Sequence, residues 1–225
     1  MIYSASRGFI FLKTRKTAGT SIEIALTRLC DEHDLVTPFG QSDEELRIEL
    51  TGRGARVDEV PLRRYGAKDW ARLAVRRRRA RFYNHMPAAD VRRYLGPAAW
   101  DRSLKFAVVR NPWEMVVSGY HFFDRAGNGM DAFFATGAYE RLVGSWRIYH
   151  LGDTVAVDEV VRYETLQPDL DRVAARLGTP ALELPRAKGQ FRADKRPYRE
   201  VLTEAQADRI ASDFKREIDL FGYEF

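Results

Sequence analysis

Hydroxyl and cationic side chains gather directly after the first hydrophobic run of the sequence. The stretch consists of one lysine, two small residues and three hydroxyl residues: Lys16, Thr17, Ala18, Gly19, Thr20 and Ser21. An amphipathic stretch follows, so this group stands where a helix is expected to begin. Main-chain amides point outward at such a place, and the helix dipole favours an anion. The stretch therefore predicts a cradle for a phosphate or sulfate group, and the plainer alternative is a capped helix start.

The same stretch departs from the phosphate-binding loop of nucleotide kinases. That loop has the pattern G-x-x-x-x-G-K-[ST], in which the lysine directly precedes a hydroxyl that holds Mg²⁺. Here Thr20 follows Gly19, and Lys16 lies three positions before the glycine. The second hydrophobic run ends in Arg110, where such kinases need a metal-binding aspartate. These residue types therefore predict an anionic substrate that is handled without a metal ion.

A second group of anion-binding residues follows the hydrophobic run at 104–109. Arg110 ends that run, and a guanidinium can hold a phosphate through two parallel hydrogen bonds. Ser118 lies about two turns into the helix that is expected after Pro112. A ligand that reaches both residues must therefore lie along this helix rather than on its tip.

Hydrophobic spacing predicts the strands and helices that position these residues. Short buried strands are expected at 8–13, 104–109 and within 156–163. Patterns with the helical period predict helices that begin near Thr20, Ala67, Pro87, Pro112, Pro168 and Thr203. Strands that alternate with helices indicate an α/β fold with a mainly parallel sheet flanked by helices. Ligands of such folds bind at the carboxyl ends of the strands, where both anion-binding groups lie.

Capping signals refine the expected starts of two helices. Thr20 with Glu23, and Thr203 with Gln206, form capping-box patterns at two helix starts. A basic helix is expected over residues 67–81.

Length and composition indicate one domain. The 225 residues fit a single domain, 1–225, with a long insertion or lid at about 31–80. Residues 31–66 show no sustained hydrophobic period and are not expected to join the core. Cys30 is the only cysteine of the sequence, which excludes an intrachain disulfide and a cysteine-rich metal site. No apolar run is long enough for a membrane span or a signal peptide, so a cytoplasmic location is expected.

The charge balance of the chain is mildly basic. Lysine and arginine total 37, aspartate and glutamate total 32, and the net charge is +5. Much of this excess lies in Arg76–Arg79, with Arg72 and Arg81 nearby. The run has three interpretations: a solvated helix face, a site for an acidic glycan acceptor, or a contact with a membrane surface. Phe82 and Tyr83 are the only aromatic residues that adjoin it, so a nucleic-acid partner is not expected.

The two groups together resemble those of the sulfotransferases that use 3′-phosphoadenosine-5′-phosphosulfate (PAPS). The sequence looks closest to a branch with carbohydrate 2-O-sulfotransferase-like and small bacterial enzymes. FIFLKTRKTAGTSIE is similar to the family loop that holds the 5′-phosphosulfate, and KFAVVRNPWEMVVSGY is similar to the block that holds the 3′-phosphate. NHMPAADVRRYL is similar to a block in which a histidine precedes a short helix, and VDEVVRYETL and DLFGYEF look like further landmarks. Arg15 departs from the family, which usually has proline before the loop lysine.

The resemblance implies a role for each candidate residue. Lys16 would stabilise the bridging and leaving oxygens, and His85 would be the general base that accepts the proton of the acceptor hydroxyl. Taken alone, a single histidine is more often a satisfied structural residue. The remaining residues would bind the two phosphates of the nucleotide: Thr17, Ala18, Gly19, Thr20, Ser21, Arg110 and Ser118. Arg192 is expected to close over the nucleotide, and no metal ligand is expected.

The resemblance also implies the reaction. An enzyme of P-loop-like sulfotransferase architecture would transfer a sulfuryl group from PAPS to a hydroxyl acceptor, in line and without metal, because fixed cations suffice for the smaller charge of a sulfuryl group. A carbohydrate or glycoconjugate is the first expected acceptor, and a small alcohol or a phenol is the next. The alternative enzyme is a P-loop nucleotide or small-molecule kinase. The sequence leaves the oligomeric state open.

Overall fold

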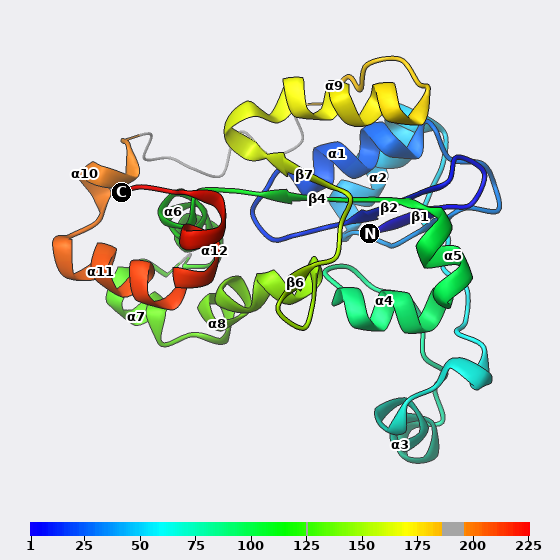
Figure 1. The fold of residues 1–225 in the computed structure, drawn as a ribbon. Coiled ribbons are helices and arrows are strands. Elements are labelled where there is room, and N and C mark those ends of the chain that lie inside the picture. Colours follow the sequence, from blue (N-terminus) through cyan, green and yellow to red (C-terminus); the bar gives the residue numbers. More distant parts are fainter. Residues whose placement is uncertain (125, 186–195) are drawn as a thin grey trace.

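A mixed sheet of five strands forms the centre of the protein. The computed structural model describes residues 1–124, 126–185 and 196–225. The strand order is β3 (Leu35–Val36), β1 (Ile2–Ser4), β2 (Phe9–Leu12), β4 (Leu104–Val109) and β7 (Glu159–Arg162). Strands β2, β4 and β7 are parallel, whereas β1 runs antiparallel to both β2 and β3. The α/β prediction is confirmed, and the sheet is parallel at its centre and antiparallel at one side (Figure 1).

Helices and short turns connect these strands. The helices of the described ranges are α1 (Gly19–Thr27), α2 (Gln41–Thr51), α3 (Ala67–Arg76), α4 (Ala88–Leu95), α5 (Pro97–Arg102), α6 (Pro112–Phe123), α7 (Met130–Phe134), α8 (Gly137–Val143), α9 (Leu166–Leu177), α10 (Tyr198–Val201), α11 (Glu204–Asp213) and α12 (Lys215–Phe221). The 3₁₀ turns are η1 (Leu62–Arg64), η2 (Gly144–Ile148) and η3 (Tyr163–Thr165). Strands β5 (His150–Leu151) and β6 (Thr154–Val155) form a separate antiparallel pair.

The alternation of side chains along β2 sends hydrophobic residues to both faces of the sheet. Phe9 and Phe11 pack with residues of α1 and α9 on one face. Ile10 and Leu12 pack with residues of α4, α6 and α8 on the other face. All four side chains are fully buried, and each contributes about 1.5–3 kcal/mol to folding. The sheet is thus covered by helices on both sides, as Figure 1 shows for α9 and α4.

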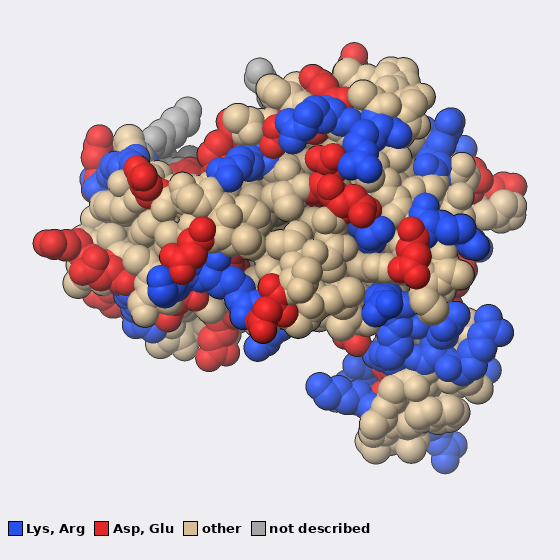
Figure 2. Space-filling model, viewed as in Figure 1, with Lys and Arg blue, Asp and Glu red and all other residues tan. Residues whose placement is uncertain are grey.

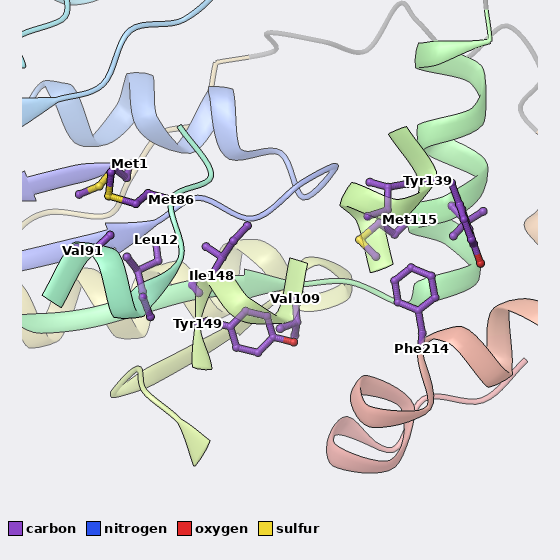
Figure 3. Packing of buried hydrophobic residues seen from close by; sticks show 14 of the residues in the cluster. Met1, Leu12, Met86, Val91, Val109, Met115, Tyr139, Ile148, Tyr149 and Phe214 are labelled. Atoms are coloured by element: carbon purple, nitrogen blue, oxygen red, sulfur yellow. The ribbon is translucent and has the colours of Figure 1, made fainter. Parts of the chain in front are cut away.

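The larger of the two hydrophobic clusters extends beyond the sheet. Figure 3 shows Leu12 of β2 beside Val91 of α4 and Ile148 of η2, and the cluster continues to Met115 and Phe214 farther along. This cluster therefore anchors the carboxyl ends of β2 and β4 to the helices that pack on this face of the sheet.

The two capping boxes have different outcomes. The box of Thr203 and Gln206 is present at the start of α11. The predicted capping box of Thr20 and Glu23 is wrong: α1 begins at Gly19, after a left-handed Ala18, so Thr20 is already its second residue, and no side chain caps the helix. Glu23 is fully buried inside the protein, where it binds a lysine instead of the helix start.

The helix expected at 67–81 ends at Arg76. Arg77 adopts a left-handed conformation with a φ of 49°, and an extended segment follows. There the amide of Val60 donates to the carbonyl of Ala80 (2.9 Å). A longer helix would place Arg76 beside Arg79 and Arg77 beside Arg81 on its surface, where like charges repel, so the extended pairing is favoured.

The segment 31–66, expected to lie outside the core, contributes to it. Strand β3 extends the sheet, and Val60 is 1% exposed. Helix α2 buries Arg47, which donates to the carbonyl of Thr37 (3.2 Å) and lies over the ring of Phe39. The hydrophobic period was absent from this segment because a buried arginine takes the place of an apolar residue.

A membrane span was not expected, and within the described residues no helix has the length and apolar composition that crossing a bilayer requires.

Candidate active site

The loop between β2 and α1 has an unusual backbone. Lys16 and Ala18 both adopt left-handed conformations, with φ values of 59° and 58°. Non-glycine residues rarely adopt this region, which is costly by about 1–3 kcal/mol at each position and is often found at functional sites. Residues of alternating hand can turn successive amides toward one concavity that suits an anion.

The threonines of the loop fix its shape from inside. Thr14 donates its hydroxyl to the carbonyl of Val108 on β4. The hydroxyl of Thr17 lies 2.8 Å from the hydroxyl of Thr14, and Thr17 is 1% exposed. This differs from the expectation that the Thr17 hydroxyl would contact an anion, because that hydroxyl points into the protein. Thr20 is also buried, whereas Ser21 is only partly so.

The first residue of α1 must be small because a lysine stem lies against it. A Cβ at Gly19 would come within 2.8 Å of Cγ of Lys13. The Nζ atom of Lys13 lies 2.7 Å from Oε2 of Glu23, which also pairs with the amino group of Met1. Burial opposes the charge of Glu23, but these two cations outweigh it and hold its pKa below the usual value. The buried pair thus ties the end of β2 to α1.

Arg110 joins the two strand ends that the sequence singled out. Its Nη1 atom donates to the carbonyl of Lys16 (2.7 Å), and its Nη2 atom pairs with Glu114 (3.0 Å). The guanidinium lies 3.9 Å from the ring centre of Tyr163. Its Nε atom is buried and has no hydrogen-bond partner among the described residues. The side chain is 9% exposed, so Arg110 is held rigidly at the junction.

Helix α6 presents three residues along one face toward the loop. Glu114, Ser118 and Phe122 are spaced four residues apart and therefore lie above one another on the helix surface. Glu114 pairs with Arg110, and the ring of Phe122 lies 4.0 Å from Nζ of Lys16. Ser118, which is partly buried, thus lies between the contacts made by the two cations.

His85 lies against the start of the loop. Its Nδ1 atom is 3.0 Å from the carbonyl oxygen of Lys13. Because a carbonyl only accepts hydrogen bonds, Nδ1 carries the proton and Nε2 carries the lone pair. Burial, together with the charges of Arg15 and Lys13, lowers the pKa of His85 to about 3. The imidazole is therefore neutral at neutral pH, in the tautomer that a base at Nε2 requires.

More cations surround His85 than the sequence indicated. Arg15, directly before the loop lysine, acts on the charge of both His85 and Tyr83. Burial and the charge of Arg141 lower the pKa of Arg15. The sequence analysis missed Arg141 because it lies far along the chain, on α8.

Other candidate residues lie elsewhere or are not described. Arg192 falls within residues 186–195, which lie outside the described ranges. Two further histidines are not part of the loop: the ring of His150 is hydrogen-bonded to the carbonyl of Trp146, and His33 is exposed. No group of three or more His, Cys, Asp or Glu side chains suited to a metal ion occurs in the described part of the chain.

Glu114 and Phe122 are site residues that the sequence analysis missed. The spacing of Arg110 and Glu114, four positions apart around a helix start, is the signal that could have identified the first of them. The contact of Phe122 with the loop lysine has no such signal, because it depends on the packing of α6 against the loop.

Comparison with known proteins identifies a relative. An uncharacterized protein from Archaeoglobus fulgidus is 31% identical over 106 residues, which cover 84% of that protein and 42% of this chain. The chain belongs to the same family as this archaeal protein. No protein-family model matches the chain, and no solved structure matches it significantly. Because the archaeal relative is itself uncharacterized, the kinship assigns no activity.

Proposed function

We propose that the protein is a PAPS-dependent sulfotransferase of P-loop-like architecture that sulfates a hydroxyl acceptor without metal. The observation that carries the proposal is the hydrogen bond from Arg110 to the carbonyl of Lys16. This hydrogen bond brings the cationic end of β4 next to the loop whose left-handed backbone suits an anion. The two together suit one ligand with two anionic groups. The motif resemblance supplies the chemical identity of that ligand.

The residues present fit such a nucleotide. The guanidinium of Arg110 would hold the 3′-phosphate, and Ser118 adds a hydroxyl along α6. The amides of Gly19, Thr20 and Ser21 begin α1 and would hold the 5′-phosphate. When bound, PAPS supplies an activated sulfuryl group and a phosphate leaving group.

Lys16 and His85 divide the remaining work. Lys16 carries its charge on a flexible stem beside the loop, where it would stabilise negative charge on the leaving oxygens. His85 would accept the acceptor proton at Nε2, because its Nδ1 proton is committed to the carbonyl of Lys13. Since the pKa of about 3 results partly from the charges of Arg15 and Lys13, an anion bound in the neighbouring loop would raise it and make the base stronger.

The acceptor we propose first is a carbohydrate or glycoconjugate hydroxyl. This choice comes from the resemblance of the loop and of the second block to carbohydrate sulfotransferases, and a panel of hydroxyl acceptors tests it directly. Labelled sulfuryl transfer from PAPS is measured to sugars, small alcohols and phenols, with and without a chelator.

Ligand-dependent melting tests the nucleotide assignment without knowledge of the acceptor. Adenosine 3′,5′-bisphosphate at about 100 times its Kd stabilises the protein by about 2.7 kcal/mol, which raises the Tm of a chain of this size by about 5–10 °C. We expect this shift in the presence of a chelator. A shift with ATP and Mg²⁺ alone would instead identify a kinase, and no shift with the bisphosphate would overturn the proposal.

Two lysine variants test whether Lys16 contributes to catalysis. Lys16→Ala removes the loop charge and lowers kcat by about 100-fold or more, the scale of one transition-state charge contact. Lys215→Ala is the matched control, because Lys215 is 74% exposed and pairs with Asp219 on α12. Equal activity of the two variants would remove Lys16 from the mechanism.

A further inference from the structure

The inner face of α3 is fixed to the body by one buried carboxylate. Asp69 is 3% exposed and accepts hydrogen bonds from the hydroxyl of Tyr94 (2.6 Å) and the amide of Gly66 (3.0 Å). It also forms an ion pair with Arg93 of α4. Burial opposes the charge of Asp69, but these donors outweigh it and hold its pKa below the usual value. The helix is therefore held in one orientation, although it stands away from the sheet (Figure 1).

The opposite face of α3 is apolar and open to solvent. Val75 is 82% exposed, and Trp70, whose ring meets Tyr65 edge-on, is 49% exposed. Helical spacing places three exposed alanines on the side away from Asp69: Ala67, Ala71 and Ala74. An apolar face on a projecting helix that the body does not cover indicates an interaction surface.

Arginines flank this apolar face. A cavity of about 620 Å³ beside α3 is lined by five arginines and two aromatic residues: Arg72, Arg76, Arg78, Arg79, Arg81, Phe82 and Tyr83. Glu59 pairs with both Arg79 and Arg81, so one carboxylate meets two of these cations. Figure 2 shows the Lys and Arg side chains gathered on this arm next to a surface without charge. The arm therefore presents a positive potential beside an apolar tip.

We propose that the α3 arm docks the protein on a bilayer of anionic phospholipid. Tryptophan and aliphatic side chains enter the interfacial region of a bilayer, and flanking arginines bind the headgroup phosphates. A soluble linear polyanion would bind the arginines but leave Val75 and Trp70 exposed to water. It would therefore explain the basic part of the surface but not the apolar part. This inference does not depend on the proposed sulfuryl transfer.

Vesicle flotation of the full chain tests the docking. Vesicles of phosphatidylcholine are compared with vesicles that contain about one third phosphatidylglycerol, which carry the negative surface charge that attracts arginine. We expect flotation with the anionic vesicles at about 0.1 M salt and its loss at about 0.5 M, because salt screens exposed charges. The double variant Arg78→Ser with Arg79→Ser lowers the partition coefficient about 30-fold, the effect of two interfacial cations.

A second variant tests the apolar face alone. Val75→Asp places a charge at a highly exposed position that the fold does not need, and it lowers partitioning by about 10-fold or more. The control is Arg7→Ser with Arg102→Ser, which removes two exposed arginines from the body and leaves flotation unchanged. Equal Tm values show that every variant is folded. Absence of flotation with anionic vesicles overturns the proposal. Unchanged flotation of Val75→Asp also overturns it. If that variant floats unchanged and the protein binds dextran sulfate, the arginines instead form a groove for a soluble polyanion.

Discussion

Replacing Arg110 by lysine separates the two proposed anion sites. The guanidinium spans the carbonyl of Lys16 (2.7 Å) and the carboxylate of Glu114 (3.0 Å), and a lysine keeps the charge but cannot span both. If Arg110 holds the 3′-phosphate, one charge-assisted hydrogen bond is lost, which amounts to about 1.5–3 kcal/mol. The Kd of adenosine 3′,5′-bisphosphate then rises about 10- to 100-fold.

Calorimetric titration with two nucleotides gives this prediction its specificity. Adenosine 5′-monophosphate lacks the 3′-phosphate, so its Kd is expected to change by less than about threefold in Arg110→Lys. Arg162→Lys is the matched control, because Arg162 also ends a strand, donates to a main-chain carbonyl (Phe221, 2.7 Å) and lies over a tyrosine ring. An equal loss of affinity for both nucleotides would refute the assignment, since Arg110 would then act only by shaping the loop.

Three further predictions follow from the buried groups. His85 stays neutral at pH 5, because burial and two cations lower its pKa to about 3, and NMR titration of its ring nitrogens should show no protonation above about pH 4; a midpoint near 6.5 would contradict this. Glu217 has a pKa that burial raises to about 7, so the folded state binds the proton more tightly and stability falls as pH rises from about 4.5 to 7. The loss is about 3 kcal/mol, and Glu217→Gln should abolish this pH dependence in urea titrations at pH 5 and pH 8. Gly19→Ala forces a Cβ against Lys13 and should lower stability by about 1–3 kcal/mol, whereas Gly137→Ala, also at the first residue of a helix, should change it by under about 0.5 kcal/mol, a difference that thermal melting resolves.

The sequence predicted the strands and helices whose buried residues are apolar. The run 104–109 is hydrophobic apart from Lys105, and the structure has a strand over the same residues. Helix α2 was missed because its buried residue is Arg47, and the three-residue β1 is too short to show a period. The turn of the chain at Arg77 depends on pairing with a segment about twenty residues earlier, which no local pattern reveals.

The candidate site was predictable in its cations but not in its carboxylates. Lys16 and Arg110 follow hydrophobic runs, so a parallel sheet brings both to one edge. Glu23 was expected to complete a capping box with Thr20 but lies buried against Lys13, because α1 begins after Ala18 and Thr20 is already inside the helix. Such a difference is within the usual uncertainty of helix boundaries read from sequence.

The cations of the site link anion binding to the strength of the candidate base. Arg15 and Lys13 act on His85 through charge, and both lie in or beside the loop that would hold the nucleotide. An anionic charge about 8 Å from the imidazole contributes about 2 kcal/mol at an effective dielectric of about 20, which raises the pKa by about 1.5 units. Without the anion, His85 is too weak a base to remove a hydroxyl proton efficiently. With the anion bound, the same residue moves toward the range that general-base catalysis requires. The loop would thus make the proposed base depend on the ligand, and Arg15 is one of the two cations that set this dependence.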